Sequence, residues 1–67
     1  MKRFKVLEVN NVIKNSTSYT KSCVVEDLET KEIISIIDEN ACGLRAEIID
    51  KIDNFDLIVG DEFKIKD

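Results

Sequence analysis

The acidic side chains in the second half of the sequence are its most prominent candidates for chemistry. Carboxylates can bind a metal ion, act as a general acid or base, or attract the basic surface of another protein. Each of these uses requires a different spacing of the side chains. The acids that we take as candidates for a common face are Asp50, Asp53, Asp56, Asp61 and Glu62.

These acids do not match a known metal-binding pattern. An EF-hand loop takes its calcium ligands from alternate positions, with a central glycine and a closing glutamate, whereas Asp50, Asp53 and Asp56 are three residues apart. Zinc sites combine histidine and cysteine ligands, but the sequence has no histidine and only two cysteines, Cys23 and Cys42. The sequence therefore predicts neither a metal site nor a bound cofactor.

A catalytic centre has few candidates as well. Without histidine, catalysis would need a carboxylate, lysine or cysteine with a shifted pKa in a cleft, and a chain of 67 residues rarely encloses a pocket of about 300 Å³. Cys42 is the one reactive candidate, because a helix N-terminus next to Gly43 would lower its thiol pKa. A small residue packed beneath the helix is the simpler interpretation. We expect no catalytic residue and no enzymatic activity.

The cysteines also bear on the compartment. A secreted chain of this size usually carries four or more cysteines in disulfides, whereas thiols inside the cell stay reduced. No stretch approaches the roughly 18 apolar residues of a membrane-spanning helix. An alternating segment follows Met1–Phe4, where a signal peptide would have an apolar run. We therefore expect a cytoplasmic protein with free thiols and no membrane partner.

Charge is distributed unevenly along the sequence. Residues 1–22 contain five basic residues and one acid, whereas residues 23–67 contain five basic residues and thirteen acids. Clustered acids attract a basic partner and repel nucleic acid. If folding keeps the two sets apart, the acids named above form a partner-binding face, and the chain is a non-enzymatic protein-binding module, more specifically an acidic inhibitor or regulator of a nucleic-acid-handling protein. If folding intermixes them, the carboxylates merely keep the protein soluble.

Nucleic-acid binding is the alternative function. Arg3, Lys5 and Lys21, with the aromatic ring of Tyr19, form a basic patch if the first two strands pair. Such patches bind single-stranded nucleic acid through phosphate contacts and base stacking. The acids in the rest of the chain oppose this attraction, so we favour a protein partner over an accessory role in nucleic-acid binding.

Alternating apolar residues predict three strands in the first half of the chain. They span Lys2–Ile13, Tyr19–Leu28 and Ile33–Ile37. We expect a bulge or bend near Asn10 and Asn11 and a polar turn at residues 14–18. The third strand is apolar on both faces, which predicts a central position in the sheet with a covering layer on each side.

A helix is predicted after the third strand. Apolar residues recur at every fourth position from Leu44 to Ile52, which indicates a helix over Ala41–Asp53. Asp38 or Asn40 would serve as its N-cap. A further strand is the alternative, because part of this segment also alternates.

The end of the chain predicts one or two more strands. Leu57–Val59 and Glu62–Ile65 are apolar segments separated by Gly60 and Asp61, where a kink needs the positive φ that glycine supplies. We therefore expect a single domain over residues 1–67. Its class is α+β, mainly β, with a barrel-like sheet of four or five strands and one short helix in the order β-β-β-α-β-β.

This order of elements, together with the segment Leu57–Ile65 and its Gly60-Asp61 pair, resembles small OB-fold and SH3-like barrel domains. The resemblance implies a ligand groove over the second and third strands, where OB domains bind oligonucleotides. Because a core of this size supplies only about 3–5 kcal/mol of stability, a structural subunit that forms a homo-oligomer through a strand edge is the third alternative.

Overall fold

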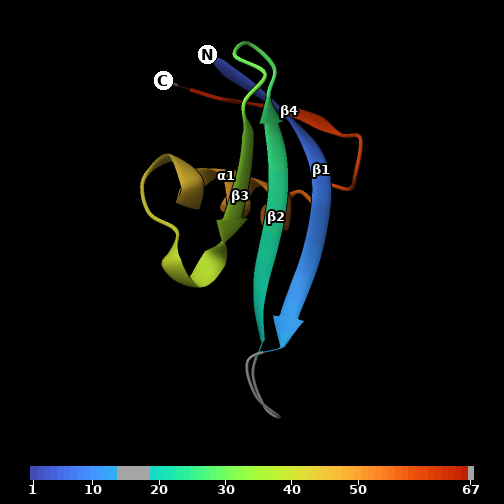
Figure 1. The fold of residues 1–67 in the computed structure, drawn as a ribbon, viewed down its shortest axis with the longest axis vertical. Coiled ribbons are helices and arrows are strands. Elements are labelled where there is room, and N and C mark those ends of the chain that lie inside the picture. Colours follow the sequence, from blue (N-terminus) through green and yellow to red (C-terminus); the bar gives the residue numbers. More distant parts are fainter. Residues whose placement is uncertain (14–18, 67) are drawn as a thin grey trace.

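In the part of the chain that the structure describes, four antiparallel strands form one open sheet, and a helix covers one of its faces (Figure 1). The computed structural model describes residues 1–13 and 19–66, and at residues 11–13, 19 and 20 it describes the backbone only. The predicted turn at residues 14–18 therefore lies outside the described residues. The elements are β1 Lys2–Ile13, β2 Tyr19–Asp27, β3 Ile33–Ile37, the short 3₁₀ helix η1 Asp38–Asn40, α1 Leu44–Asn54 and β4 Glu62–Ile65. The order across the sheet is β3-β2-β1-β4.

A β-bulge in β1 decides which of its side chains reach the helix. The register between β1 and β2 shifts immediately after Val6, so Leu7 is the extra residue. Side chains change phase beyond a bulge, which brings Val9, like Val6, to the face that α1 covers. The predicted position near Asn10 and Asn11 was wrong, because both asparagines pair regularly with β2.

The helix packs against the sheet through three isoleucines. Ile48, Ile49 and Ile52 are buried, as their helical spacing predicted. The helix begins at Leu44, later than predicted, because Gly43 with its φ of 60° turns the chain into it and only glycine adopts a positive φ without strain. The predicted N-cap residues belong to η1 instead. No helix in the described part of the chain is long and apolar enough to cross a bilayer.

The core lies between α1 and the sheet. Phe4 of β1 and Phe63 of β4 stack with their ring centroids 5.6 Å apart, which stabilises the pairing of the last strand with the first. The buried apolar side chains that form this core are Phe4, Val6, Cys23, Val25, Ile36, Ile48, Ile49, Ile52, Phe63 and Ile65. Nothing in the described part of the chain covers the opposite face of the sheet.

The sheet does not close into a barrel, so the predicted barrel was wrong. β4 pairs with β1 alone, and β3 lies at the far edge. The segment Leu57–Val59 is not a strand, and Ile58 begins a turn that ends at Asp61, whose N–H donates to the Ile58 carbonyl (3.0 Å). Val6 holds this turn, because it accepts from the Gly60 N–H (2.9 Å) and donates to the Asp61 carbonyl (2.8 Å). A small four-stranded antiparallel sheet with one helix is the part of the barrel resemblance that stands.

The position of β3 also differs from the prediction. Ile36 is buried beneath α1, but Ile33 and Ile37 on the other face are 58% and 46% exposed. The sequence shows that both faces of this strand are apolar, but it does not show whether another layer covers the second face. The two-sided pattern therefore did not require a central position.

Candidate functional site

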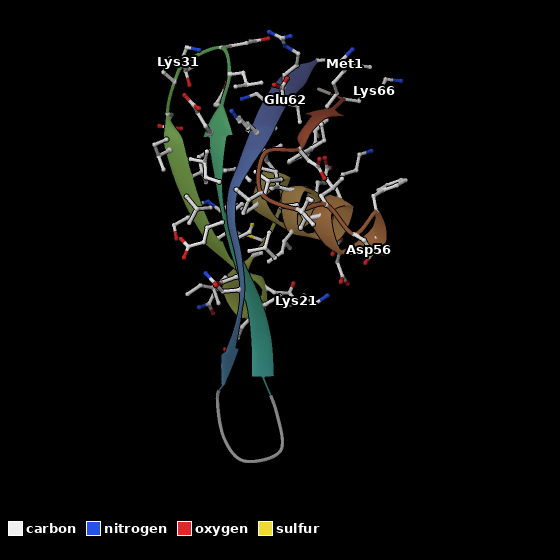
Figure 2. All side chains as sticks on the ribbon, turned by 90° about the vertical axis from the view of Figure 1, so that its right-hand side faces the viewer. Met1, Lys21, Lys31, Asp56, Glu62 and Lys66 are labelled. Atoms are coloured by element: carbon white, nitrogen blue, oxygen red, sulfur yellow. The ribbon has the colours of Figure 1, made fainter. Side chains whose placement is uncertain are left out.

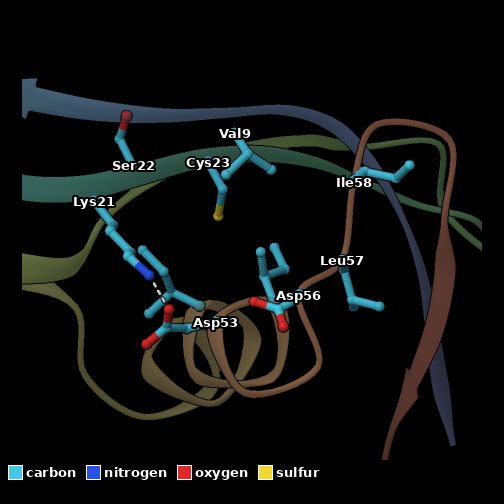
Figure 3. A pocket seen from close by; sticks show the side chains of 10 residues that line it. Val9, Lys21, Ser22, Cys23, Asp53, Asp56, Leu57 and Ile58 are labelled. Atoms are coloured by element: carbon cyan, nitrogen blue, oxygen red, sulfur yellow. Dashed lines mark hydrogen bonds and ion pairs between the residues drawn. The ribbon is translucent and has the colours of Figure 1, made fainter.

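A hollow opens between the β1–β2 hairpin and the C-terminal half of α1 (Figure 3), with a volume of about 290 Å³. Its walls are apolar and come from three parts of the chain. They are Val9 and Cys23 of the sheet, Ile49 and Ile52 of the helix, and Leu57 and Ile58 of the loop that follows. The rim is polar and consists of Lys21, Ser22, Asp53 and Asp56. An apolar interior with a few polar groups at its margin is the usual construction of a binding pocket.

The way in which α1 ends shapes this hollow. The Leu57 N–H donates to the Ile52 carbonyl (3.0 Å), and the Asp56 N–H donates to the Asp53 carbonyl (3.4 Å), which is the Schellman arrangement of a helix end. It folds Leu57 back toward the helix and gives Asp56 a φ of 50°. Glycine is the commonest residue at this position because it has no Cβ. Asp56 therefore holds a conformation that lowers stability, with its side chain at the rim.

The two rim carboxylates lie at the negative end of the helix dipole, where acids are disfavoured. Asp53 forms an ion pair with Lys21 across the mouth of the hollow (Figure 3). The two side chains are 51% and 41% exposed, so the pair adds little stability. The Asp56 carboxylate has no hydrogen bond or ion pair with the described residues. It is therefore available to a cation from outside the chain.

Cys23 lines the hollow but is not placed to act as a nucleophile. Its side chain is 1% exposed, and burial raises the pKa of the thiol from 9.0 to about 11. The thiol thus stays protonated at neutral pH, whereas the thiolate is the form that attacks or ligates. Cys42, the reactive candidate of the sequence, lies exposed in the connection before α1, and both cysteines are free thiols.

The structure does not gather the predicted acids into one surface. Asp53 and Asp56 meet at the hollow, but Asp50 lines a separate depression. The Asp61 carboxylate already accepts a hydrogen bond from within the chain, from the backbone N–H of Ile58 at 2.9 Å. Glu62 lies on the uncovered face of the sheet, far from Asp56 (Figure 2). Among the described residues, no group of acids and cysteines is arranged to hold a metal ion.

The predicted basic patch is divided between the two faces of the sheet. Arg3 and Lys5 flank the buried Phe4 and therefore point to the uncovered face. Lys21 lies on the opposite face, at the rim of the hollow. The side chain of Tyr19, the predicted aromatic member, lies outside the described residues. No continuous basic surface joins the described members of this patch.

Folding also intermixes charges that the sequence keeps apart. Lys5 in β1 pairs in register with Glu26 on one side and Glu62 on the other. Lys21 is bound to Asp53. Lys5 and Lys21 of the first third of the chain thus meet acids of the remainder, whereas Arg3 pairs in register with another basic residue, Lys64.

Sequence reasoning missed the apolar part of the site. Val9 and Ile58, which line the hollow, are 38% and 67% exposed. One signal was present: Ile58 and Val59 stand directly before the Gly60 turn, where polar residues are more usual.

No protein-family model, no curated protein and no solved structure matches the chain. The geometry of the fold and of the hollow therefore carries the functional argument. Together they define a class: a small two-layer α+β domain in which an apolar hollow with an acidic rim lies at one end of the helix.

Proposed function

We propose that this chain is a non-enzymatic protein-binding module that captures a partner segment in which a bulky apolar side chain stands next to basic residues. The observation that carries this proposal is the hollow at the end of α1, with apolar walls and with Asp53 and Asp56 at its rim. Nothing within the described residues fills the hollow or neutralises Asp56.

The apolar walls would supply most of the affinity. Binding energy concentrates in a few large side chains that fill desolvated pockets, and the surrounding contacts mainly exclude water. Val9 and Ile58 are exposed in the free chain and would be buried by an inserted leucine, methionine or aromatic ring. The volume of about 290 Å³ is at the lower end of the range of small-ligand pockets and suits one such side chain.

The acidic rim would supply selectivity and a faster association with the partner. Complementary charges accelerate encounter and exclude like-charged partners, and the chain has a net charge of −4. A protein with a basic surface, such as one that handles nucleic acid, fits this rim. Regulation or inhibition of such a protein is therefore the more specific form of the proposal.

Selection from a random peptide library displayed on phage tests this function and does not require an identified partner. We expect the selected peptides to combine leucine, methionine or an aromatic residue with neighbouring lysine or arginine. Ile58→Ser should weaken their binding about tenfold through faster dissociation, and Asp56→Asn should slow association and reduce its salt dependence.

A matched control distinguishes the hollow from acidity in general. Asp50→Asn removes the same charge from the same helix but outside the hollow, so it should leave the affinity for the selected peptides unchanged. Equal losses with Asp50→Asn and Asp56→Asn would assign binding to the overall charge. Selection of peptides without basic residues would contradict the role of the rim.

A further inference from the structure

A second surface lies at the opposite end of the helix, along the free edge of β3 (Figure 1). The Asp27 N–H donates to the Glu32 carbonyl at 2.8 Å, which sets the phase of hydrogen bonding between β2 and β3. Because bonded and non-bonded pairs alternate in an antiparallel ladder, the backbone groups of Ile33 and Ser35 point away from β2. They form an edge that no other described strand pairs with.

Arg45 closes part of this edge. Its Nη1 donates to the Ser35 carbonyl at 3.1 Å, so a side chain from the first turn of α1 takes the place that a neighbouring strand would occupy. Charged side chains that block an edge are a common protection against unwanted strand pairing. Arg45 is exposed, and a strand that donates to the Ser35 carbonyl can displace it.

A hollow of about 470 Å³ lies beside the edge, between β3 and the start of α1. Its apolar lining includes Ile34, Leu44 and Ile48. Side chains of an added strand alternate between the two faces of the sheet. One set would enter this hollow, and the other set would lie beside the exposed Ile33 and Ile37.

Charge selects the kind of strand that fits. Glu32 directly precedes β3 and Asp38 directly follows it, and both are exposed. A second copy that paired about Ser35 would set Glu32 of one chain against Asp38 of the other, and like charges directly opposite each other destabilise a strand pair. A segment with basic residues at its ends has the complementary pattern.

We propose that the β3 edge binds an extended segment of another protein by strand addition, and that this segment has alternating apolar side chains bracketed by lysine or arginine. Main-chain hydrogen bonds to Ile33 and Ser35 give affinity, while the hollow beside α1 and the acids Glu32 and Asp38 give selectivity. This site is separate from the hollow at the other end of α1, so the chain can hold two segments at once.

Short synthetic peptides test the edge directly. The probe has alternating valine and threonine residues with a lysine at each end, and its control has glutamate in place of lysine. We expect the lysine peptide to bind at least about tenfold more tightly than the glutamate peptide. The double variant Glu32→Lys/Asp38→Lys should reverse this preference. Glu8→Lys/Glu62→Lys makes the same change of charge on β1 and β4 and should not reverse it.

Two further variants test the backbone part. Ser35→Pro removes an N–H that points away from β2, which an edge strand tolerates, and it should abolish binding of the lysine peptide while circular dichroism shows a folded chain. Arg45→Ala frees the Ser35 carbonyl and should increase the affinity several-fold. If Ser35→Pro fails to fold, the same peptide with N-methylated amides provides the test, because it should not bind.

Several outcomes would overturn strand addition. Equal binding of the lysine and glutamate peptides would remove the charge selection, and undiminished binding of the N-methylated peptide would remove the backbone pairing. Sedimentation that shows a dimer of the wild-type chain, abolished by Ser35→Pro and unaffected by the lysine peptide, would assign the edge to a second copy instead. Failure of these peptides leaves the hollow at the C-terminal end of α1 unaffected, because its binding is measured separately.

Discussion

The two faces of the sheet carry side chains from the same strands, yet they differ in nearly every property. On the face that α1 covers, Phe4, Val6 and Val25 are fully buried. On the other face, Lys5 and Glu26 pair across neighbouring strands near solvent. Stability is therefore concentrated on one face, while the other can change with little effect on the fold.

The difference explains where the two proposed sites lie. Both hollows are found where the cover provided by α1 ends: one beside the first turn at Leu44, and one beside the last turn at Asp53. A short helix cannot cover a four-stranded sheet completely, so apolar side chains remain accessible at both of its ends. Both proposed binding surfaces therefore lie at the boundary of the core and not at its centre.

The largest expected effect is a difference in stability loss between two adjacent residues of β3, Ile36 and Ile37. Ile36→Ala should lower the free energy of unfolding by about 2–5 kcal/mol, because it leaves a cavity beneath α1. Ile37→Ala removes a side chain that is 46% exposed and should cost less than about 1 kcal/mol. Urea unfolding measures both, with Ile36→Val as a milder companion if the alanine variant does not fold. Equal losses would contradict the difference between the faces.

The second effect concerns a titrating group on the covered face. Burial raises the pKa of the Cys23 thiol from 9.0 to about 11, so the folded chain retains a proton that the unfolded chain loses. The stabilisation is complete below pH 9 and declines as the pH rises toward about 11, by about 2–3 kcal/mol in total. Unfolding measured against pH should show this decline in Cys42→Ala but not in Cys23→Ala.

A smaller effect is expected at the C-terminal end of α1, where the helix stops covering the sheet. Asp56→Gly removes a side chain from a position with a φ of 50° and an acid from the end of a helix, and it should raise the free energy of unfolding by about 0.5–1 kcal/mol. The same change should weaken binding of the selected peptides. A gain in stability with no loss of binding would show that the strained aspartate has no role at the hollow.

The smallest effect is confined to acid pH. Asp27 is 5% exposed, and its carboxylate accepts the N–H groups of Glu29 (2.9 Å) and Thr30 (3.3 Å). The first of these hydrogen bonds is the main cause that lowers the pKa of Asp27 below its usual 3.8. Its stabilisation is therefore present above about pH 4 and is lost as the pH falls below that value. Thermal melts at several acid pH values measure this loss. The melting temperature of Asp27→Asn should fall less between neutral and acid pH than that of the wild-type chain.

Local patterns predicted most of the secondary structure. The alternation in β2 placed Cys23 and Val25 on one face, and the spacing of Ile48 and Ile52 selected a helix over a strand. The positive φ of Gly60 was also predicted correctly. These features depend on neighbours a few residues away, so the sequence contains the information directly.

The candidate site was predicted only in part. Asp53 and Asp56 were among the predicted acids, but nothing in their spacing separated them from Asp61 or Glu62. Which acids meet depends on the turn that Asp61 closes and on the face that β4 presents. Both follow from contacts with Lys5 and Val6 of β1, which lie more than fifty positions earlier in the sequence.

The sequence by itself determined the elements: where each strand alternates, which stripe of the helix is apolar, and where glycine turns the chain. Only the tertiary structure decided that the sheet stays open, that β3 lies at its edge, and that the bulge at Leu7 turns Val9 toward the hollow. The physical reason is that propensity and alternation act over a few residues. Strand order and cover depend instead on which distant surfaces exclude water together.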